Sequence, residues 1–79
     1  MDTSKIREHM PVVSDGNERI ATVDRIEGDS IKLTKDQMGQ HHWIPVSWVT
    51  SVDQSVHLDR DGQRAMREWM ATPPEGAQH

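Results

Sequence analysis

The sequence predicts a small, mainly β protein: an antiparallel β-barrel of about five short strands followed by one C-terminal α-helix. Three observations predict this fold class. Short apolar segments alternate with polar residues, turn residues separate these segments about every eight to twelve positions, and an apolar stripe at helical spacing follows near the C-terminus. Closure into a barrel would let strands this short avoid exposed edges.

The expected strands contain two irregular positions. Pro45 interrupts the fourth strand, and a proline without an N–H group confines a strand to a sheet edge or a bulge. Ile20, Val23 and Ile26 in the second strand are spaced by three, which cannot place all of them on one face of a regular strand. We therefore expect a β-bulge or a bend there. The expected strands cover residues 11–13, 18–27, 30–35, 43–46 and 56–58, with further apolar residues at 48–52.

Turn and helix signals mark the ends of these strands. Residues 4–10 are expected to form one helical turn, which Pro11 stops. Residues 14–17 form a turn in which Gly16 would supply a positive φ, and Gly28 belongs to a second tight turn. These closely spaced turns support a barrel of short strands.

A C-terminal helix is expected after Asp61, whose side chain is placed to cap it. The apolar stripe of this helix would pack on the barrel, and arginines fall on the opposite side. The stripe consists of Ala65, Met66, Trp69 and Met70. We expect residues 1–71 to form a single domain and residues 72–79 to be a disordered C-terminal tail.

Composition limits the function classes. The chain has 79 residues, no Cys, Phe or Tyr, and a net charge of −4. A disulfide framework is excluded, and the acidic balance argues against a general nucleic-acid binder, which normally carries a basic excess. Residues 1–10 contain no apolar h-region, and no apolar run approaches the roughly 20 residues of a membrane span. We expect a cytoplasmic protein without a signal peptide.

The order of several short motifs resembles that of PRC-barrel domains. Residues 16–35, GNERIATVDRIEGDSIKLTK, are similar to the opening of that barrel, where a turn Gly leads into a strand and a second turn precedes an alternating strand. Ala21 stands where the barrel motif usually has Gly. The Ile-Pro strand at 44–45 and the closing strand at 56–58 resemble its later part. Over residues 6–69 the chain is also similar to a family of short bacterial PRC-barrel-like proteins classed only as a domain of unknown function.

The resemblance implies a docking module and not an enzyme. PRC-barrel relatives include a domain of the ribosome maturation factor that binds ribosomal protein and pre-ribosomal particles. Another relative lies in the cytoplasmic part of the H subunit of the photosynthetic reaction centre. The resemblance supplies no catalytic residues. We expect a non-catalytic protein-interaction module that docks a protein partner or forms a homodimer.

Two sets of residues are candidates for binding. The first set would dock a protein through an apolar patch, because aromatic residues and Met are favoured at interface cores. It consists of Trp43, Trp48, Met66, Trp69 and Met70. The alternative is a basic face that binds RNA or the ribosome, although specific nucleic-acid binding normally draws on a broader basic surface. That face consists of Lys32, Lys35, Arg60, Arg64 and Arg67.

The histidines and serines form no recognisable metal-binding or catalytic pattern. His41 and His42 are adjacent and would point to opposite faces of a strand, so they cannot both bind one ion. His42 and His57 are instead expected to pair across neighbouring strands or to satisfy backbone groups. No serine lies in a Gly-x-Ser-x-Gly context. We therefore expect no metal, no cofactor and no enzymatic activity.

Overall fold

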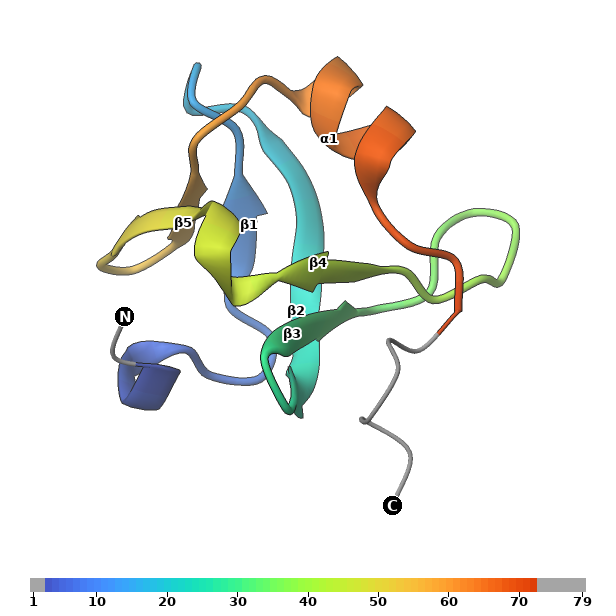
Figure 1. The fold of residues 1–79 in the computed structure, drawn as a ribbon, viewed down its shortest axis with the longest axis horizontal. Helices are drawn as coiled ribbons and strands as arrows, with labels where there is room; N and C mark the ends of the chain where they lie inside the picture. The colour runs from blue at the N-terminus through green and yellow to red at the C-terminus, as the bar shows by residue number, and fades with distance from the viewer. Residues whose placement is uncertain (1–2, 73–79) are drawn as a thin grey trace.

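The computed structural model describes residues 3–72, which form one sheet with a short helix at its C-terminal end (Figure 1). The strands pair in the order β4-β3-β2-β1-β6-β5. Neighbouring strands are antiparallel, except that β1 and β6 are parallel. In chain order the elements are η1 (Thr3–Lys5), β1 (Pro11–Val13), β2 (Arg19–Glu27), β3 (Ser30–Leu33), β4 (Trp43–Pro45), η2 (Val46–Trp48), β5 (Val49–Val52), β6 (Val56–Leu58) and α1 (Gly62–Glu68).

The predicted β content and C-terminal helix are confirmed, but the closed, antiparallel barrel of about five strands is wrong. Within residues 3–72 there are six strands in a mixed sheet, and its end strands, β4 and β5, do not pair with each other. Pro45 is the last residue of β4, and the chain reaches β5 through the 3-10 turn η2. Alternation of apolar residues determines which face of a strand is buried and not its direction, so it could not reveal the parallel pair.

Both irregular positions predicted in the strands are confirmed. Pro45 lies in β4, an end strand of the sheet. In β2 the register slips once at Ile20 and once at Asp24. Each extra residue shifts the alternation of side chains by one. As a result Val23 is buried, and Ile20 and Ile26 pack against the same core.

The N-terminal segment is less helical than predicted. A single 3-10 turn, Thr3–Lys5, replaces the helical turn expected over residues 4–10. His9 has a φ of 68° and donates its backbone N–H to the Val23 carbonyl at 2.8 Å. The Val23 N–H in turn donates to the Met10 carbonyl at 2.9 Å. These bonds tie residues 9 and 10 to β2 and withdraw them from a helix.

Two of the predicted turns contain a positive φ, one of them at an unexpected residue. Gly28 has a φ of 60°, as its tight turn requires. In the first turn Asn17, with a φ of 67°, takes the left-handed conformation in place of Gly16. The Asn17 N–H donates to the Ser14 carbonyl at 3.0 Å and closes this turn. Asn adopts the left-handed region more readily than most residues because its short polar side chain bonds locally.

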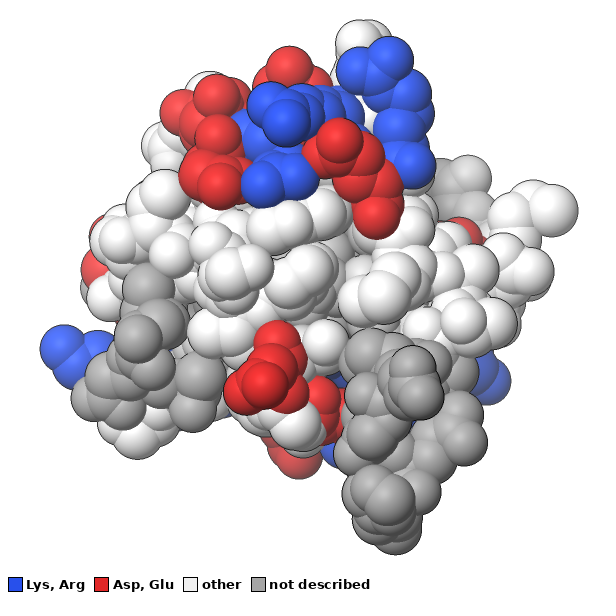
Figure 2. Space-filling model, viewed as in Figure 1, with Lys and Arg blue, Asp and Glu red and all other residues white. Residues whose placement is uncertain are grey.

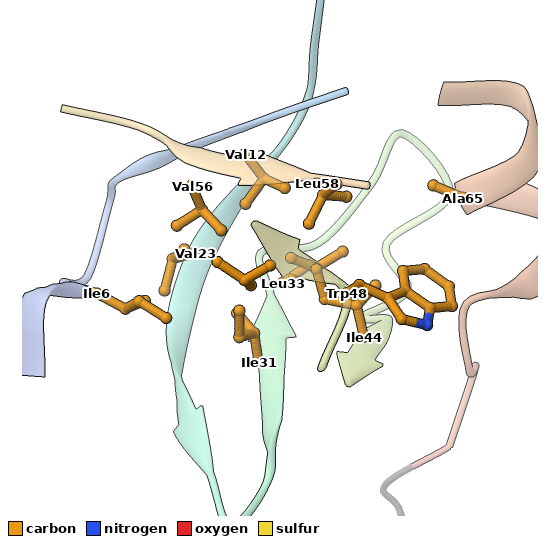
Figure 3. Packing of buried hydrophobic residues seen from close by; sticks show 11 residues of the cluster. Ile6, Val12, Val23, Ile31, Leu33, Ile44, Trp48, Val56, Leu58 and Ala65 are labelled. Atoms are coloured by element: carbon orange, nitrogen blue, oxygen red, sulfur yellow. The ribbon is translucent and has the colours of Figure 1, made fainter. Parts of the chain in front are cut away.

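The core consists mainly of aliphatic side chains contributed by every strand (Figure 3). Ile6, from the N-terminal segment, and Ala65, from α1, lie at opposite ends of this cluster in Figure 3. Full burial of a Val, Leu or Ile side chain stabilises a fold by about 1.5–3 kcal/mol, so these contacts hold the sheet together. The largest fully buried side chains are Ile31, Leu33, Ile44, Leu58, Val12, Val23 and Val56.

The predicted cap of the C-terminal helix is confirmed. The Asp61 carboxylate accepts a hydrogen bond from the Arg64 backbone N–H at 2.7 Å. Gly62, the first residue of α1, lies so close to β2 that a Cβ atom there would be 2.8 Å from Ile20 Cγ2. The absence of a side chain at this position lets the helix start directly on the sheet.

The helix ends earlier than its apolar stripe predicts. α1 stops at Glu68, and Trp69 already has an extended backbone. The Met70 N–H donates to the Trp43 carbonyl at 2.9 Å, and the Trp43 N–H donates to the Met70 carbonyl at 2.8 Å. Met66, which the stripe assigns to the packed face, is 46% exposed. Backbone pairing with β4 thus overrides the helical pattern of the side chains.

Residues 73–79 of the predicted tail lie outside the described residues, and the single domain over 1–71 stays a prediction. Within residues 3–72, no helix is both long and apolar enough to cross a membrane.

We predict that Gly62→Ala destabilises the protein, although Ala is the better helix former. The gain in helix propensity is at most about 1 kcal/mol, whereas forcing a methyl group against Ile20 costs about 1–3 kcal/mol. Urea unfolding followed by tryptophan fluorescence should show a net loss of about 1 kcal/mol. Gln63→Ala, at the next and exposed position, is the control and should not destabilise. A Gly62→Ala variant as stable as the parent would contradict the close packing.

Candidate functional site

Trp43 joins the edge strand β4 to the segment that follows α1. Its side chain is buried, and its Nε1–H donates to the Glu27 carboxylate at 3.3 Å. The backbone bridge between Trp43 and Met70 brings the neighbouring Trp69 against His42. The Trp69 and His42 rings stack with their centres 4.3 Å apart and 18° between their planes. These contacts attach the end of the described chain to the sheet.

Trp48, in η2, is covered by Arg60. The guanidinium carbon of Arg60 lies 3.8 Å from the centre of the Trp48 ring, which is a cation–π contact. The same guanidinium donates from Nε to Asp59 and from Nη1 to Glu68, both at 2.6 Å. The hydrogen bond between the Arg60 and Asp59 side chains raises the pKa of Arg60 and lowers the pKa of Asp59. Arg60 thus links η2, the segment after β6 and helix α1.

The five residues predicted to bind a partner do not form one exposed patch. Trp43 and Trp48 are buried, Trp69 and Met70 are half-buried, and Met66 is exposed on α1. The backbone bridge brings Trp43, Trp69 and Met70 together. Trp48 lies beneath Arg60 of the β6–α1 connection. Much of this set packs inside the molecule, which leaves only part of it for contact with a partner.

The lysines of the predicted basic face belong to β3 and to the segment after it. The Lys32 Nζ atom is 3.8 Å from Asp24 and 4.0 Å from Glu27, and it lies 5.8 Å from the centre of the Trp43 ring. Lys35 is exposed beyond the end of β3. The positive charge of Lys32 is therefore balanced by the carboxylates of Asp24 and Glu27 on the neighbouring strand β2.

The arginines of the predicted basic face are mixed with acids. Arg60 and Arg64 share one carboxylate, that of Glu68, at 2.6 Å and 3.2 Å. Arg67 is exposed on α1. Blue and red atoms alternate in this region of Figure 2, over α1 and the connection before it. The arrangement is a mixed-charge surface and not a basic stripe.

Each of the three central histidines faces a different group. The distances are 2.7 Å from His41 Nδ1 to the Leu33 carbonyl, 3.6 Å from His42 Nδ1 to an Asp36 oxygen and 2.9 Å from His57 Nε2 to an Asp53 oxygen. The expected pairing of His42 with His57 is wrong, because β4 and β6 are not neighbours in the sheet. In the described part of the chain, no group of three or more His, Asp or Glu side chains is arranged to hold a metal ion.

One run of the chain, residues 37–52, contains no charged side chain. We call the exposed surface of this run the uncharged face. This run contains no Asp, Glu, Lys or Arg and covers the end of a loop, β4, η2 and β5. Figure 2 shows the corresponding white area below the charged atoms of the α1 region. Sequence reasoning about single residues missed this surface, and a scan for gaps in charge would have found it.

Hydrogen bonds to Asp36 hold the loop before β4, which carries Met38. Asp36 Oδ1 accepts hydrogen bonds from the backbone N–H groups of Met38 at 2.8 Å and Gln40 at 3.0 Å. The Gly39 N–H donates to the Asp36 carbonyl at 3.0 Å. The bond from Gln40 is the main cause of the lowered pKa of Asp36, so this carboxylate stays ionised and keeps the loop folded. Met38 itself is 84% exposed.

A cleft of about 280 Å³ lies beside the stacked pair of Trp69 and His42. Its apolar surface comes from β2, from the end of β3 and from Trp69. Two cations, Arg19 and Lys35, also line it. No sequence motif unites these residues, because they come from four separate parts of the chain. The remaining lining residues are Ile20, Ala21, Thr22, Leu33, Thr34 and Asp36.

We predict that Arg60→Met lowers the melting temperature by about 5 °C at neutral pH. Met can still cover Trp48 but has no charge for Asp59. Arg67→Met, at an exposed position on α1, should leave the melting temperature unchanged. Thermal unfolding followed by circular dichroism measures both.

The effect of Arg60→Met should also depend on pH. Arg60 lowers the pKa of Asp59 in the folded protein from an ordinary value of about 3.8. The stabilisation is therefore complete above that ordinary value and is lost as the pH falls through the lowered, folded-state value. The difference between parent and variant should shrink in acid. An equal difference at neutral pH and at about pH 2 would contradict the role of this ion pair.

The chain matches a family model but no individual curated protein or solved structure. A family model described as "Uncharacterized protein conserved in bacteria (DUF2171)" matches residues 6–66, which include every strand of the sheet and the first turn of α1. The expected similarity to a bacterial family of unknown function is thereby confirmed, and the chain belongs to the DUF2171 family of proteins conserved in bacteria.

Proposed function

We propose that the protein is a non-catalytic interaction module that docks a protein through its uncharged face, residues 37–52. The observation that supports this proposal is the gap in charge. Charged residues make up 28% of the chain, yet none occurs in this run. Charged residues are depleted at the cores of protein–protein interfaces, so a surface without charged residues is suited to contact with a partner.

Met38 would serve as an anchor at one end of this face. Met is enriched at interface cores because its flexible, polarizable side chain adapts to a pocket. The loop that carries Met38 is already held by the hydrogen bonds of Asp36. Little loop entropy would then be lost on binding, which favours affinity.

The partner under this proposal is either a separate protein or a second copy of the chain. A homodimer would bury the same face on both copies, because a two-fold interface is self-complementary.

Two finer expectations accompany the proposal. Kinship with PRC-barrels is supported by the order of the motifs at 16–35 and 44–58, and a cytoplasmic location is supported by a sequence without Cys.

The alternative function, binding of RNA or the ribosome through Arg60, Arg64 and Arg67, has weaker support. Two of these arginines share the carboxylate of Glu68, and Arg60 also pairs with Asp59. Phosphate binding would have to displace these acids. Binding through this face would weaken steeply as salt is raised, whereas apolar docking would not, which separates the two functions.

We predict that Ser47→Glu abolishes binding to the partner without unfolding the protein. Ser47 is exposed in η2, at the centre of the run 37–52, so a carboxylate there is tolerated by the fold but must be desolvated in an interface. The tagged protein is recovered from its native cells after nuclease treatment, and bound proteins are quantified by mass spectrometry. Gln63→Glu, an equal change of charge at an exposed position of α1, is the matched control.

The proposal requires one stoichiometric protein that is retained by the parent and by Gln63→Glu and is lost from Ser47→Glu. Sedimentation of the purified proteins tests the homodimer in the same way. If both variants keep every partner and the same mass in solution, residues 37–52 are not the docking face. Recovery of ribosomal material that nuclease abolishes would favour the alternative function.

A further inference from the structure

The cleft beside Trp69 contains two cations without an acidic partner. Arg19 and Lys35 both line it, and within residues 3–72 neither of them forms an ion pair. Arg19 Nη2 donates to the Thr22 hydroxyl at 2.5 Å, which directs the guanidinium along β2. Lys32, Arg25, Arg60 and Arg64, by contrast, all pair with carboxylates. The cleft therefore has an excess of positive charge at its rim.

The one acid in the cleft, Asp36, balances at most one of these two positive charges and forms no ion pair with either cation. Asp36 Oδ1 is used by the backbone N–H groups of Met38 and Gln40, and Oδ2 lies 3.6 Å from His42 Nδ1. Each oxygen of Asp36 thus faces a nitrogen atom of the segment between β3 and β4. An anion from outside would find Arg19 and Lys35 free to interact.

Part of the wall of the cleft is apolar and held in place. Ile20, Ala21 and Leu33 provide aliphatic surface, and Leu33 belongs to the core. Trp69 is half-buried and is fixed by its stack on His42. Binding sites for small molecules combine such walls with a few polar groups that orient the ligand.

We infer that this cleft binds a small apolar molecule that carries one carboxylate. The carboxylate would lie between Arg19 and Lys35, and the apolar part would contact Trp69 and the aliphatic wall. The volume of about 280 Å³ limits the ligand to roughly the size of a single ring with a short acidic chain. This inference does not depend on the proposed docking function, because the ligand would contact Arg19, Lys35 and Trp69, which lie outside residues 37–52, and only His42 of the cleft lining belongs to that run.

The test is a titration of the ¹⁵N-labelled full chain with 3-phenylpropionate, in which NMR measures the chemical shifts of the backbone amides. Shifts should concentrate at Arg19–Thr22, Leu33–Asp36 and Trp69, with a dissociation constant on the order of 1–10 mM for a ligand of this size. 3-Phenylpropionamide, which has the ring without the charge, and acetate, which has the charge without the ring, are the ligand controls. Both should bind at least about threefold more weakly.

Substitutions of Arg19 and Lys35 test whether these two cations bind the carboxylate of the ligand. Arg19→Gln and Lys35→Gln should each weaken binding of 3-phenylpropionate about threefold or more, and the double variant should lose saturable binding. Arg67→Gln removes an exposed cation from α1 and should leave binding unchanged. Both cleft positions are exposed, and unchanged spectra without ligand verify the fold.

Three results would overturn the inference: no shifts at the cleft with 20 mM 3-phenylpropionate, equal binding of the uncharged amide, or unchanged binding by the double variant. A peptide ending in a free apolar residue presents the same chemistry as a free acid. N-acetyl-Ala-Leu is therefore titrated in parallel, and the tighter of the two ligands shows which source the cleft prefers.

Discussion

The small size of the aliphatic core limits how the rest of the chain can be held. Its largest fully buried side chains are Val, Ile and Leu, carried on strands that have three or four residues apart from β2. A domain of this length buries only a modest share of its surface, so such a core leaves little excess stability. The sequence has no Cys and hence no disulfide to compensate. Segments outside the sheet consequently need attachments of their own.

The three tryptophans provide these attachments. Trp48 lies beneath Arg60 and connects η2 to the start of α1, while Trp43 and Trp69 secure the segment after the helix through Met70 and His42. Each indole covers a large apolar area and still has a polar or cationic neighbour, which suits a boundary between core and solvent. Because aromatic surface is used for this purpose, the face of residues 37–52 is distinguished by its lack of charge and less by exposed rings.

Local features of the fold followed from the sequence, whereas long-range pairings did not. Alternating residues located the strands, the spacing of Ile20, Val23 and Ile26 indicated the bulges in β2, and Asp61 marked the helix start, because each depends on neighbouring residues alone. The parallel β1–β6 pair, the open sheet and the early end of α1 depend on backbone contacts between distant segments. The same distinction applies to the sites: the uncharged run is visible in the sequence, but the cleft is assembled from residues 19–22, 33–36, 42 and 69.

The parallel pair also sets an order of events while the protein is being made. One neighbour of β1, the strand β2, follows it directly in the chain, but its other neighbour, β6, follows much later. At about 5–20 residues per second, roughly 2–9 s separate the synthesis of Val12 from that of its partner Val56. During this interval one edge of β1 has no strand beside it. The sheet therefore cannot be completed until β6 has been synthesised.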